Sequence, residues 1–222
     1  MLYIVSTPIG NLKDITLRAI ETLKSVDLIA AEDTRHTQIL LKTYDIHTPL
    51  TSYYEHNEIS KSKHLGELLE QGKNIALVTD AGTPGISDPG YAIIKLAKEK
   101  NIPVAVIPGP TALIAALSLS GAPAHSFIFE GFLPVKSGAR QKKLEALKGE
   151  ERTVIFYEAP HRILKSLEDI KDILGDPVVI CAREITKKFE EVKTAKASAL
   201  IDHFNQKPPK GEFVLILNQG EL

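Results

Sequence analysis

The chain has 222 residues, of which 43% are hydrophobic, and a formal net charge of −1. This length and apolar content allow one large core or two modest ones. The near-neutral charge provides no global basic field for nucleic acid, so any such contact must be local. The single cysteine, Cys181, excludes an intramolecular disulfide framework and a cysteine-based metal cluster, and its apolar surroundings favour a buried strand residue over a catalytic thiol.

The first half of the chain alternates strand-like runs with helical patterns. The strands are expected at 2–6, 27–31, 75–79 and 103–107, and the helices near 16–25, 36–43, 58–71, 90–100 and 111–120. This alternation predicts crossover connections and a largely parallel sheet.

The pattern changes after Gly121. Strands are expected near 126–130, 152–157, 177–183, 189–194 and 212–217, with helices near 137–148, 161–173 and 197–205. The second half is therefore predicted to be richer in strands, with a mixed sheet. We place an N-terminal α/β domain with a mainly parallel sheet at 1–121, a C-terminal α/β domain with a mixed sheet at 122–222, and a cleft between them.

A long segment without charged residues, from Ile102 to Phe129, is interrupted by proline and glycine. Its uninterrupted part, Ala112 to Leu119, is far shorter than the roughly 20 residues that a membrane span requires. The N-terminus opens on a strand, without a basic region and an apolar signal core. We therefore expect a cytoplasmic protein that does not enter a membrane.

Turn-rich segments follow several predicted strands, at 7–11, 79–90, 108–111 and 158–161. In α/β proteins such turns gather at the carboxyl ends of the strands, where ligands bind. Asp80 either accepts hydrogen bonds from a ligand or holds its own loop through Asx-turn bonds, while Ala81 and Gly82 let a ligand approach the backbone. Thr111 either caps the helix that Ala112 begins or leaves N–H groups of that helix for a ligand.

Charged clusters also lie at predicted strand ends. The segment from Glu32 to Thr37 indicates substrate handling, but Asp33 or Thr34 is equally a natural N-cap, with Glu32 paired to Arg35. Lys187 and its neighbour either contact a substrate or form a solvated basic turn. The basic residues between 136 and 148 either meet phosphates or keep a helix soluble.

Common cofactor signatures are missing from the sequence. There is no Walker motif and no glycine-rich dinucleotide fingerprint, which disfavours ATP-driven phosphoryl transfer and ordinary NAD chemistry. The seven histidines are scattered without the paired helical spacing that binds zinc. We therefore expect no metal.

Motifs along nearly the whole chain resemble one family, the ribosomal RNA small-subunit methyltransferase I family, cytidine 2′-O-methyltransferases within the tetrapyrrole methylase fold. The matching segments are 6–12 with 14–16, 31–37, 79–90, 108–110, 130–134, 156–162, 182–184 and 210–212. The Glu-Asp-Thr-Arg-His-Thr cluster together with the Asp-Ala-Gly-Thr-Pro loop makes this resemblance specific.

The resemblance implies two α/β domains with S-adenosylmethionine (S-adenosyl-L-methionine) in the cleft between them, and a homodimer. The cofactor-binding residues that it implies are Pro8, Asp80, Ala81, Gly82, Ile86, Thr111, Ala112, Tyr157, Ala182 and Gly211. Some members continue past the final strand, whereas this sequence stops at Leu222. If that extension holds RNA, this protein must dock its substrate by other means.

The reaction expected from the resemblance is methyl transfer to a ribose 2′-hydroxyl of small-subunit ribosomal RNA, either naked or in the assembled small ribosomal subunit. Asp33 and Glu32 are our candidates for the base that takes the hydroxyl proton, and Arg35 and Lys187 for placing phosphate or ribose. Two alternatives stay open: methylation of a tetrapyrrole or another small acceptor, and a non-catalytic regulator that binds S-adenosylmethionine.

Overall fold

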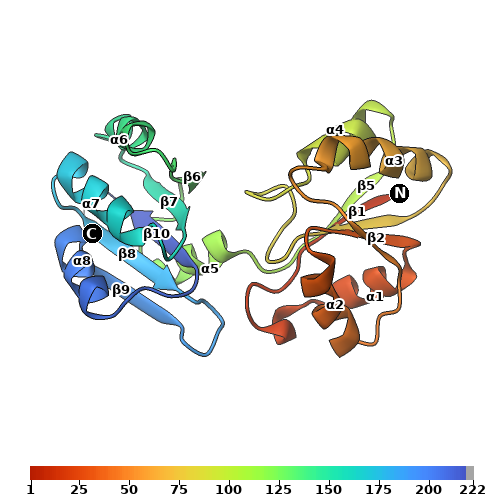
Figure 1. Cartoon of the computed structure of the whole chain (residues 1–222), viewed down its shortest axis with the longest axis horizontal. Helices are drawn as coiled ribbons and strands as arrows, with labels where there is room; N and C mark the ends of the chain where they lie inside the picture. Colours follow the sequence, from red (N-terminus) through yellow and green to blue (C-terminus); the bar gives the residue numbers. More distant parts are fainter. Residues whose placement is uncertain (219–222) are drawn as a thin grey trace. The chain divides into compact units, whose positions relative to one another are not determined.

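The computed structural model describes residues 1–218, and these fall into two compact units that meet in the sequence at Thr111 and Ala112. The expected boundary lay later, after residue 121. The difference arises from the helix α5 (Ala112–Ser120), which packs on the sheet of the second unit, against β7 and β10. Each unit is an α/β structure built around its own sheet, in agreement with the predicted fold class (Figure 1).

The first unit contains a five-stranded sheet of order β3-β2-β4-β1-β5, in which every neighbouring pair is parallel. Its strands are β1 (Leu2–Val5), β2 (Leu28–Ala31), β3 (Leu50–Ser52), β4 (Ile75–Val78) and β5 (Val104–Ile107). Its helices are α1 (Leu17–Ser25), α2 (Thr34–Thr43), α3 (Glu58–Glu70) and α4 (Tyr91–Glu99), with a short 3-10 helix η1 (Leu12–Asp14). The sequence prediction missed only β3 and η1 among these elements.

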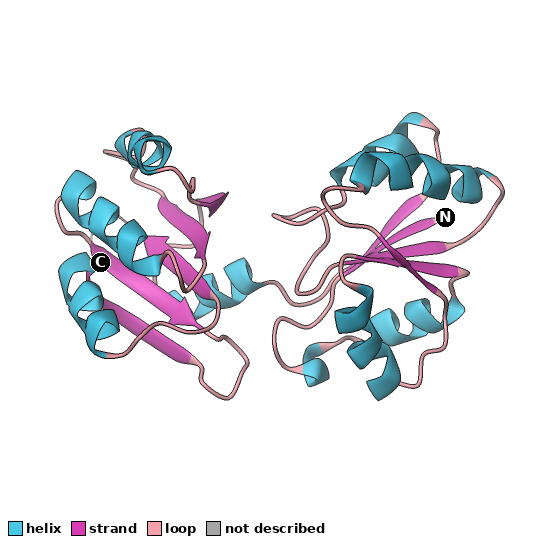
Figure 2. Cartoon of the chain, viewed as in Figure 1, coloured by secondary structure: helices cyan, strands magenta, loops and turns pink. Residues whose placement is uncertain are grey.

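Helices cover both faces of this sheet, with α1 and α2 on one face and α3 and α4 on the other (Figure 2). The strands bury side chains on both faces because successive residues alternate. In β4, for example, Val78 contributes to the core with α1 and α2, and Leu77 to the core with α3 and α4. This explains why the strands read as short, continuous apolar runs.

The second unit contains a five-stranded mixed sheet of order β6-β7-β10-β8-β9. Its strands are β6 (Phe127–Phe132), β7 (Thr153–Glu158), β8 (Val178–Arg183), β9 (Glu191–Lys196) and β10 (Phe213–Leu217). Its remaining helices are α6 (Ser137–Glu145), α7 (Ile163–Leu174) and α8 (Ala197–Gln206). Only β6 and β7 pair in parallel, which confirms the mixed sheet. The expected excess of strands is wrong, because β3 brings the first sheet to the same number.

One face of the second sheet packs against α6, α7 and α8, where Phe156, Cys181 and Leu215 join the helix side chains in a single core. The strand residues between them, such as Ile180 and Ile216, are fully buried and belong to the opposite face. In the part of the chain that the structure describes, no helix combines the length and the apolar character that crossing a membrane requires.

Candidate functional site

The turns after β1 and β4 are held side by side at the carboxyl edge of the first sheet. Thr7 N donates to Gly82 O at 2.8 Å, and Gly82 N donates to Thr7 O at 3.0 Å. The Thr7 hydroxyl also donates to Thr79 O at 3.0 Å. The helices that follow these neighbouring strands lie on opposite faces, an arrangement that opens a ligand-binding crevice in α/β sheets. Two predicted cofactor segments, Pro8 and residues 80–82, are therefore brought together.

The turn after β5 packs against the same edge. Ser6 N donates to Ile107 O at 3.2 Å, and a Cβ atom on Gly109 would lie only 3.0 Å from Ser6 Cβ. Gly82 has a different requirement. Its φ is +86°, whereas a Cβ atom would meet only Ile9 Cγ2 at 3.7 Å and Pro110 O at 3.9 Å. Glycine is thus needed there for backbone conformation more than for space.

The remainder of the loop 79–90 is fixed by the helix α3. Glu58 Oε1 accepts hydrogen bonds from Gly90 N and Ala92 N, both at 3.0 Å, and so caps the start of α4. Gly90 has a φ of +154°, and a Cβ atom there would lie 2.9 Å from Gly85 N. Ile86, a predicted cofactor contact in this loop, is 44% exposed. The loop is therefore an ordered structure with an apolar side chain turned outward.

Three carboxylates from two strand ends meet beside these turns. The Thr79 hydroxyl donates to Glu32 Oε2, and Asp80 N donates to the same oxygen at 3.3 Å. Asp80 Oδ1 in turn accepts from Asp33 N at 3.1 Å. Burial, with the neighbouring negative charges of Glu32 and Asp33, raises the pKa of Asp80 despite the hydrogen bond from Asp33 N. A carboxylate with a raised pKa at such an edge is a functional candidate.

Asp33 also forms an ion pair with Arg35. Asp33 Oδ1 accepts from Arg35 N at 2.8 Å, which makes Asp33 the N-cap of α2, and Asp33 Oδ2 lies 2.9 Å from Arg35 Nη2. The hydrogen bonds from the Arg35 side chain and backbone lower the pKa of Asp33 to about 2. The expected pairing of Glu32 with Arg35 is wrong, since Glu32 turns toward Thr79. The Arg35 side chain is 90% exposed and stays accessible to a substrate.

In the second unit, two predicted cofactor residues, Tyr157 and Ala182, lie on the face that α5 covers. Tyr157 and Ala182 both oppose Val214 of β10, so they stand in one row across three strands. The Tyr157 hydroxyl accepts a hydrogen bond from Leu113 N at 3.1 Å, next to Ala112 in the first turn of α5. The N–H group of Leu113 therefore already has an acceptor within the protein. It is not among the groups that the turn at Thr111 can offer a ligand.

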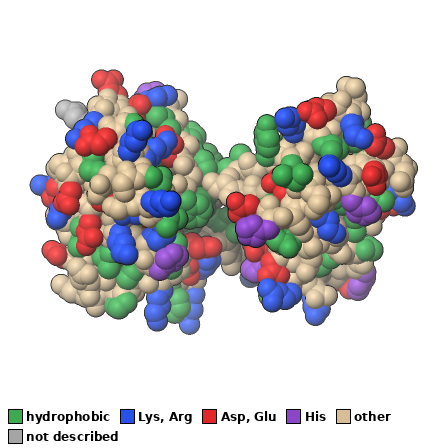
Figure 3. All heavy atoms as spheres, turned by 45° about the horizontal axis from the view of Figure 1, so that its top comes forward, with side chains coloured by type: hydrophobic (Ala, Val, Ile, Leu, Met, Phe, Trp, Pro, Cys, Tyr) green, Lys and Arg blue, Asp and Glu red, His purple; other side chains and the backbone are tan. Residues whose placement is uncertain are grey.

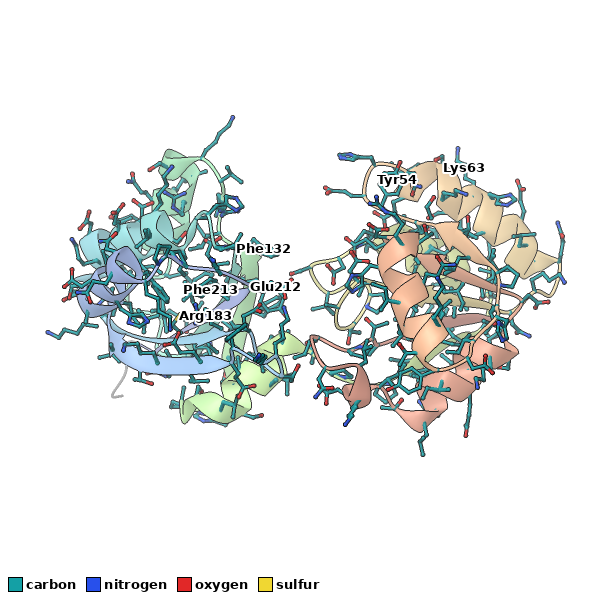
Figure 4. All side chains as sticks on the ribbon, turned by 60° about the horizontal axis from the view of Figure 1, so that its bottom comes forward. Tyr54, Lys63, Phe132, Arg183, Glu212 and Phe213 are labelled. Atoms are coloured by element: carbon teal, nitrogen blue, oxygen red, sulfur yellow. The ribbon has the colours of Figure 1, made fainter. Side chains whose placement is uncertain are left out.

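Gly211 and Lys187 lie at one edge of the second sheet, where Arg183 ends β8 and Glu212 precedes β10 (Figure 4). A Cβ atom on Gly211 would collide with the Glu184 side chain. Lys187 Nζ lies 2.9 Å from both Glu184 Oε1 and Glu212 Oε2. Burial opposes the charge on Lys187, but the hydrogen bonds to the two carboxylates raise its pKa. Lys187 therefore links the turn after β8 to the residue that precedes β10.

The structure also tests two other predictions from the sequence, one about Cys181 and one about the basic residues of α6. Cys181 is buried in β8, and burial raises the pKa of its thiol to about 12, which confirms a core residue and disfavours a nucleophile. On α6, Arg140 forms a buried ion pair with Asp169 at 2.6 Å, and Lys143 pairs with Glu130. Two basic side chains of this helix are thus paired with carboxylates of the protein itself.

The contacts of two residues that shape the site could not be predicted from the sequence. Thr7 links the turns after β1 and β4, and Glu58 caps α4 from a position 32 residues before Gly90. Both act through long-range contacts, which a local pattern cannot reveal. Within residues 1–218, no three His, Cys, Asp or Glu side chains are grouped in a way that would hold a metal ion.

Comparison with known proteins identifies the family of the chain. Residues 1–201 match the family model of the tetrapyrrole (corrin/porphyrin) methylases. The chain is 52% identical over 218 residues to "Ribosomal RNA small subunit methyltransferase I" of Synechocystis sp., covering 98% of this chain and 78% of the relative. The Thermotoga maritima protein of the same name is 48% identical over 220 residues, covering 99% of each. A solved diphthine synthase shares the fold, with a TM-score of 0.79 at 16% identity over 100% of this chain and 90% of that chain. The chain belongs to the ribosomal RNA small subunit methyltransferase I family, within the tetrapyrrole methylases.

Proposed function

We propose that this protein transfers a methyl group from S-adenosylmethionine to the 2′-hydroxyl of a cytidine in small-subunit ribosomal RNA. The observation that carries the proposal is the name shared by relatives about half identical over nearly the whole chain. The first-unit site supports it, because its linked turns and carboxylates combine a place for a small ligand with groups able to accept a proton.

The residues at the carboxyl edge of the first sheet fit S-adenosylmethionine. Ala81 and Gly82 have little or no side chain, and a Cβ atom on Gly82 would make only ordinary van der Waals contacts with Ile9 and Pro110. Asp80 is partly buried and supplies an acceptor for hydroxyl or amino groups. Pro8, Ile86 and Thr111 complete the proposed contacts of this unit. Ala112, Tyr157, Ala182 and Gly211 stay proposed contacts from the second unit.

Bound S-adenosylmethionine supplies an electrophilic methyl group on a sulfonium, which departs as a neutral thioether. The protein has to align the hydroxyl oxygen with the methyl carbon and sulfur, an orientation effect of up to about 7–11 kcal/mol. A carboxylate must also take the hydroxyl proton as the new oxygen–carbon bond forms. Asp33 and Glu32 are the candidates, but the Asp33 carboxylate is engaged by Arg35, and its pKa of about 2 makes it a poor base. We therefore favour Glu32.

The other proposed contacts concern the RNA. Arg35 is exposed beside Asp33 and suits a phosphate. Use of the 2′-hydroxyl as the nucleophile would itself distinguish RNA from DNA. We also propose that the protein acts as a homodimer, as the family resemblance implies.

The test is incubation with labelled S-adenosylmethionine and three classes of acceptor: small ribosomal subunits from cells lacking this protein, the protein-free RNA of those subunits, and a tetrapyrrole. We expect label in ribosomal RNA only. Transfer to the tetrapyrrole instead would favour the small-acceptor alternative. Cofactor binding in calorimetry without transfer to any acceptor would favour a non-catalytic regulator.

A further inference from the structure

The connection between β8 and β9, residues 184–190, is an internally braced loop. Glu184 N donates to Glu212 O at 3.0 Å, Lys187 N to Glu184 O at 2.9 Å, and Thr186 N to Glu190 Oε2 at 2.6 Å. Glu184 and Thr186 have φ values of 51° and 67°, which are unfavourable for residues other than glycine. Such strain persists where surrounding contacts enforce it, and it is found most often at functional segments.

This loop holds an aromatic side chain in solvent. Phe189 is 67% exposed, and Lys188 Nζ lies 5.6 Å from the centroid of its ring. A single exposed apolar residue is ordinary on a protein surface. A ring with a cation over it, on a loop that hydrogen bonds and ion pairs hold in a strained conformation, is a more specific feature, because it offers a rigid flat face together with positive charge.

The positive charges of this loop and of the segment before β10 favour an anionic partner. The loop carboxylates are engaged internally: Glu184 with Lys187, and Glu190 with Thr186 N. Among the residues that the structure describes, Lys188 has no ion pair. Neither have the exposed Lys207 and Lys210, in the segment that leads to Gly211. In Figure 3 basic and hydrophobic side chains stand side by side at the lower edge of the second unit, the edge where the β8–β9 connection lies in Figure 1.

We propose that Phe189 and Lys188 form a stacking platform for an unpaired base of the ribosomal RNA substrate, with Lys188 also near its phosphate. This inference rests on the proposed function and assigns the RNA contact of this loop to Phe189 and Lys188, while Lys187 holds the loop in shape. Proteins bind single-stranded RNA by stacking bases on exposed aromatic rings within a basic surface. A lone ring is too small for a stable protein interface, which buries about 1,200 Å² or more in total.

A second aromatic–lysine pair serves as a matched control. Tyr91 is 72% exposed, and Lys95 Nζ lies 6.0 Å from the centroid of its ring. This pair stands on the regular helix α4, and Lys95 also lies 3.8 Å from Glu99, so its charge is partly compensated. We expect that Tyr91 does not bind the RNA.

The experiment measures the affinity of the full chain for protein-free small-subunit ribosomal RNA from cells lacking this protein. S-adenosylhomocysteine is present, and the variants are Phe189→Ala, Phe189→Tyr, Lys188→Gln and Tyr91→Ala. Loss of one stacked base should weaken binding about 5- to 150-fold in Phe189→Ala, whereas Phe189→Tyr and Tyr91→Ala should bind as wild type does. Lys188→Gln should reduce the slope of log affinity against log salt by about 0.7.

Calorimetry with S-adenosylhomocysteine should show the same affinity in all four variants. Equal RNA binding by wild type and Phe189→Ala would overturn the platform while leaving the proposed function in place. Equal weakening in Tyr91→Ala would also overturn it, because the effect would then follow from any exposed ring. Failure of the wild-type protein to bind the protein-free RNA would overturn the platform, and failure to methylate both this RNA and the small ribosomal subunits would overturn the proposed function as well.

Discussion

Replacing Glu32 by glutamine separates the structural role of this side chain from its proposed chemistry. Glu32 Oε2 accepts the Thr79 hydroxyl and Asp80 N. Glutamine keeps the length and an acceptor but loses the charge. Hydrogen bonds to a charged group contribute about 1.5–3 kcal/mol and neutral ones about 0.5–1.5, so we expect a loss of about 1 kcal/mol in unfolding free energy. For a chain of this size that corresponds to a fall of about 2–4 °C in melting temperature.

The effect on methyl transfer should be much larger. If Glu32 takes the proton of the 2′-hydroxyl, its loss should slow transfer about 10²–10⁴-fold. That range corresponds to about 2.7–5.4 kcal/mol in the activation barrier, well beyond the stability effect. The assay is single-turnover methylation of undermodified small ribosomal subunits with saturating S-adenosylmethionine, with melting curves on the same preparations.

Asp33→Asn is the matched control for this experiment. Asparagine is a good N-cap, so α2 should keep its start while the ion pair with the exposed Arg35 is lost. We expect a methyl-transfer rate within about a few-fold of the wild-type rate, because losing the ion pair shifts the neighbouring groups of the site only modestly. A full rate for folded Glu32→Gln would refute the assignment of the base, and a large loss in Asp33→Asn alone would assign it to Asp33.

Four further outcomes are expected. Gly82→Ala and Gly72→Ala both place a side chain at a φ of +86° without a steric clash, so each should lose about 1–2 kcal/mol of stability. Calorimetry should show weaker S-adenosylmethionine binding only in Gly82→Ala, and equal affinities would refute the placement of the cofactor. The hydrogen bonds from Arg35 lower the pKa of Asp33 from 3.8 to about 2, so this group stabilises the fold above pH 3.8, and that contribution is lost as pH falls toward 2. The decline in melting temperature over this interval should therefore be shallower in Asp33→Asn, and an unchanged decline would contradict the shift. Gly211→Ala must displace the Glu184 side chain and should destabilise the second unit by about 1–3 kcal/mol in denaturant unfolding, whereas a neutral result would show that the loop adjusts freely. Methyl transfer should persist in EDTA, because the sulfonium is already activated, and a loss restored by magnesium would contradict this unless RNA folding caused it.

Most elements could be predicted from the sequence because each buried strand is a short apolar run that ends in proline, glycine or polar residues. The strand β3 escaped prediction for a physical reason. Leu50, Thr51 and Ser52 form no apolar run, and they become a strand only by pairing with β2. The boundary between the two units could not be located from the sequence, because an apolar helix does not reveal which sheet it will cover.

The candidate site was predictable in its turns and less so in its pairings. The composition of the segment from Thr79 to Gly90 predicts a shaped loop, and the structure confirms an ordered one. The partners of Glu32 and Lys187 were not predictable, since Thr79 and Glu212 lie far along the chain. Local spacing suggested Arg35 for Glu32, yet the capping position of Asp33 places its carboxylate against that guanidinium instead.

The most direct test of the central proposal is the chemical position of the transferred methyl group. Small-subunit RNA that has reacted with the protein and S-adenosylmethionine is digested to nucleosides and examined by mass spectrometry against the unreacted RNA. We expect 2′-O-methylcytidine to appear, together with local resistance of the RNA chain to alkaline cleavage. A methyl group on a base, or no new modified nucleoside in RNA that lacked it beforehand, would contradict the proposed reaction.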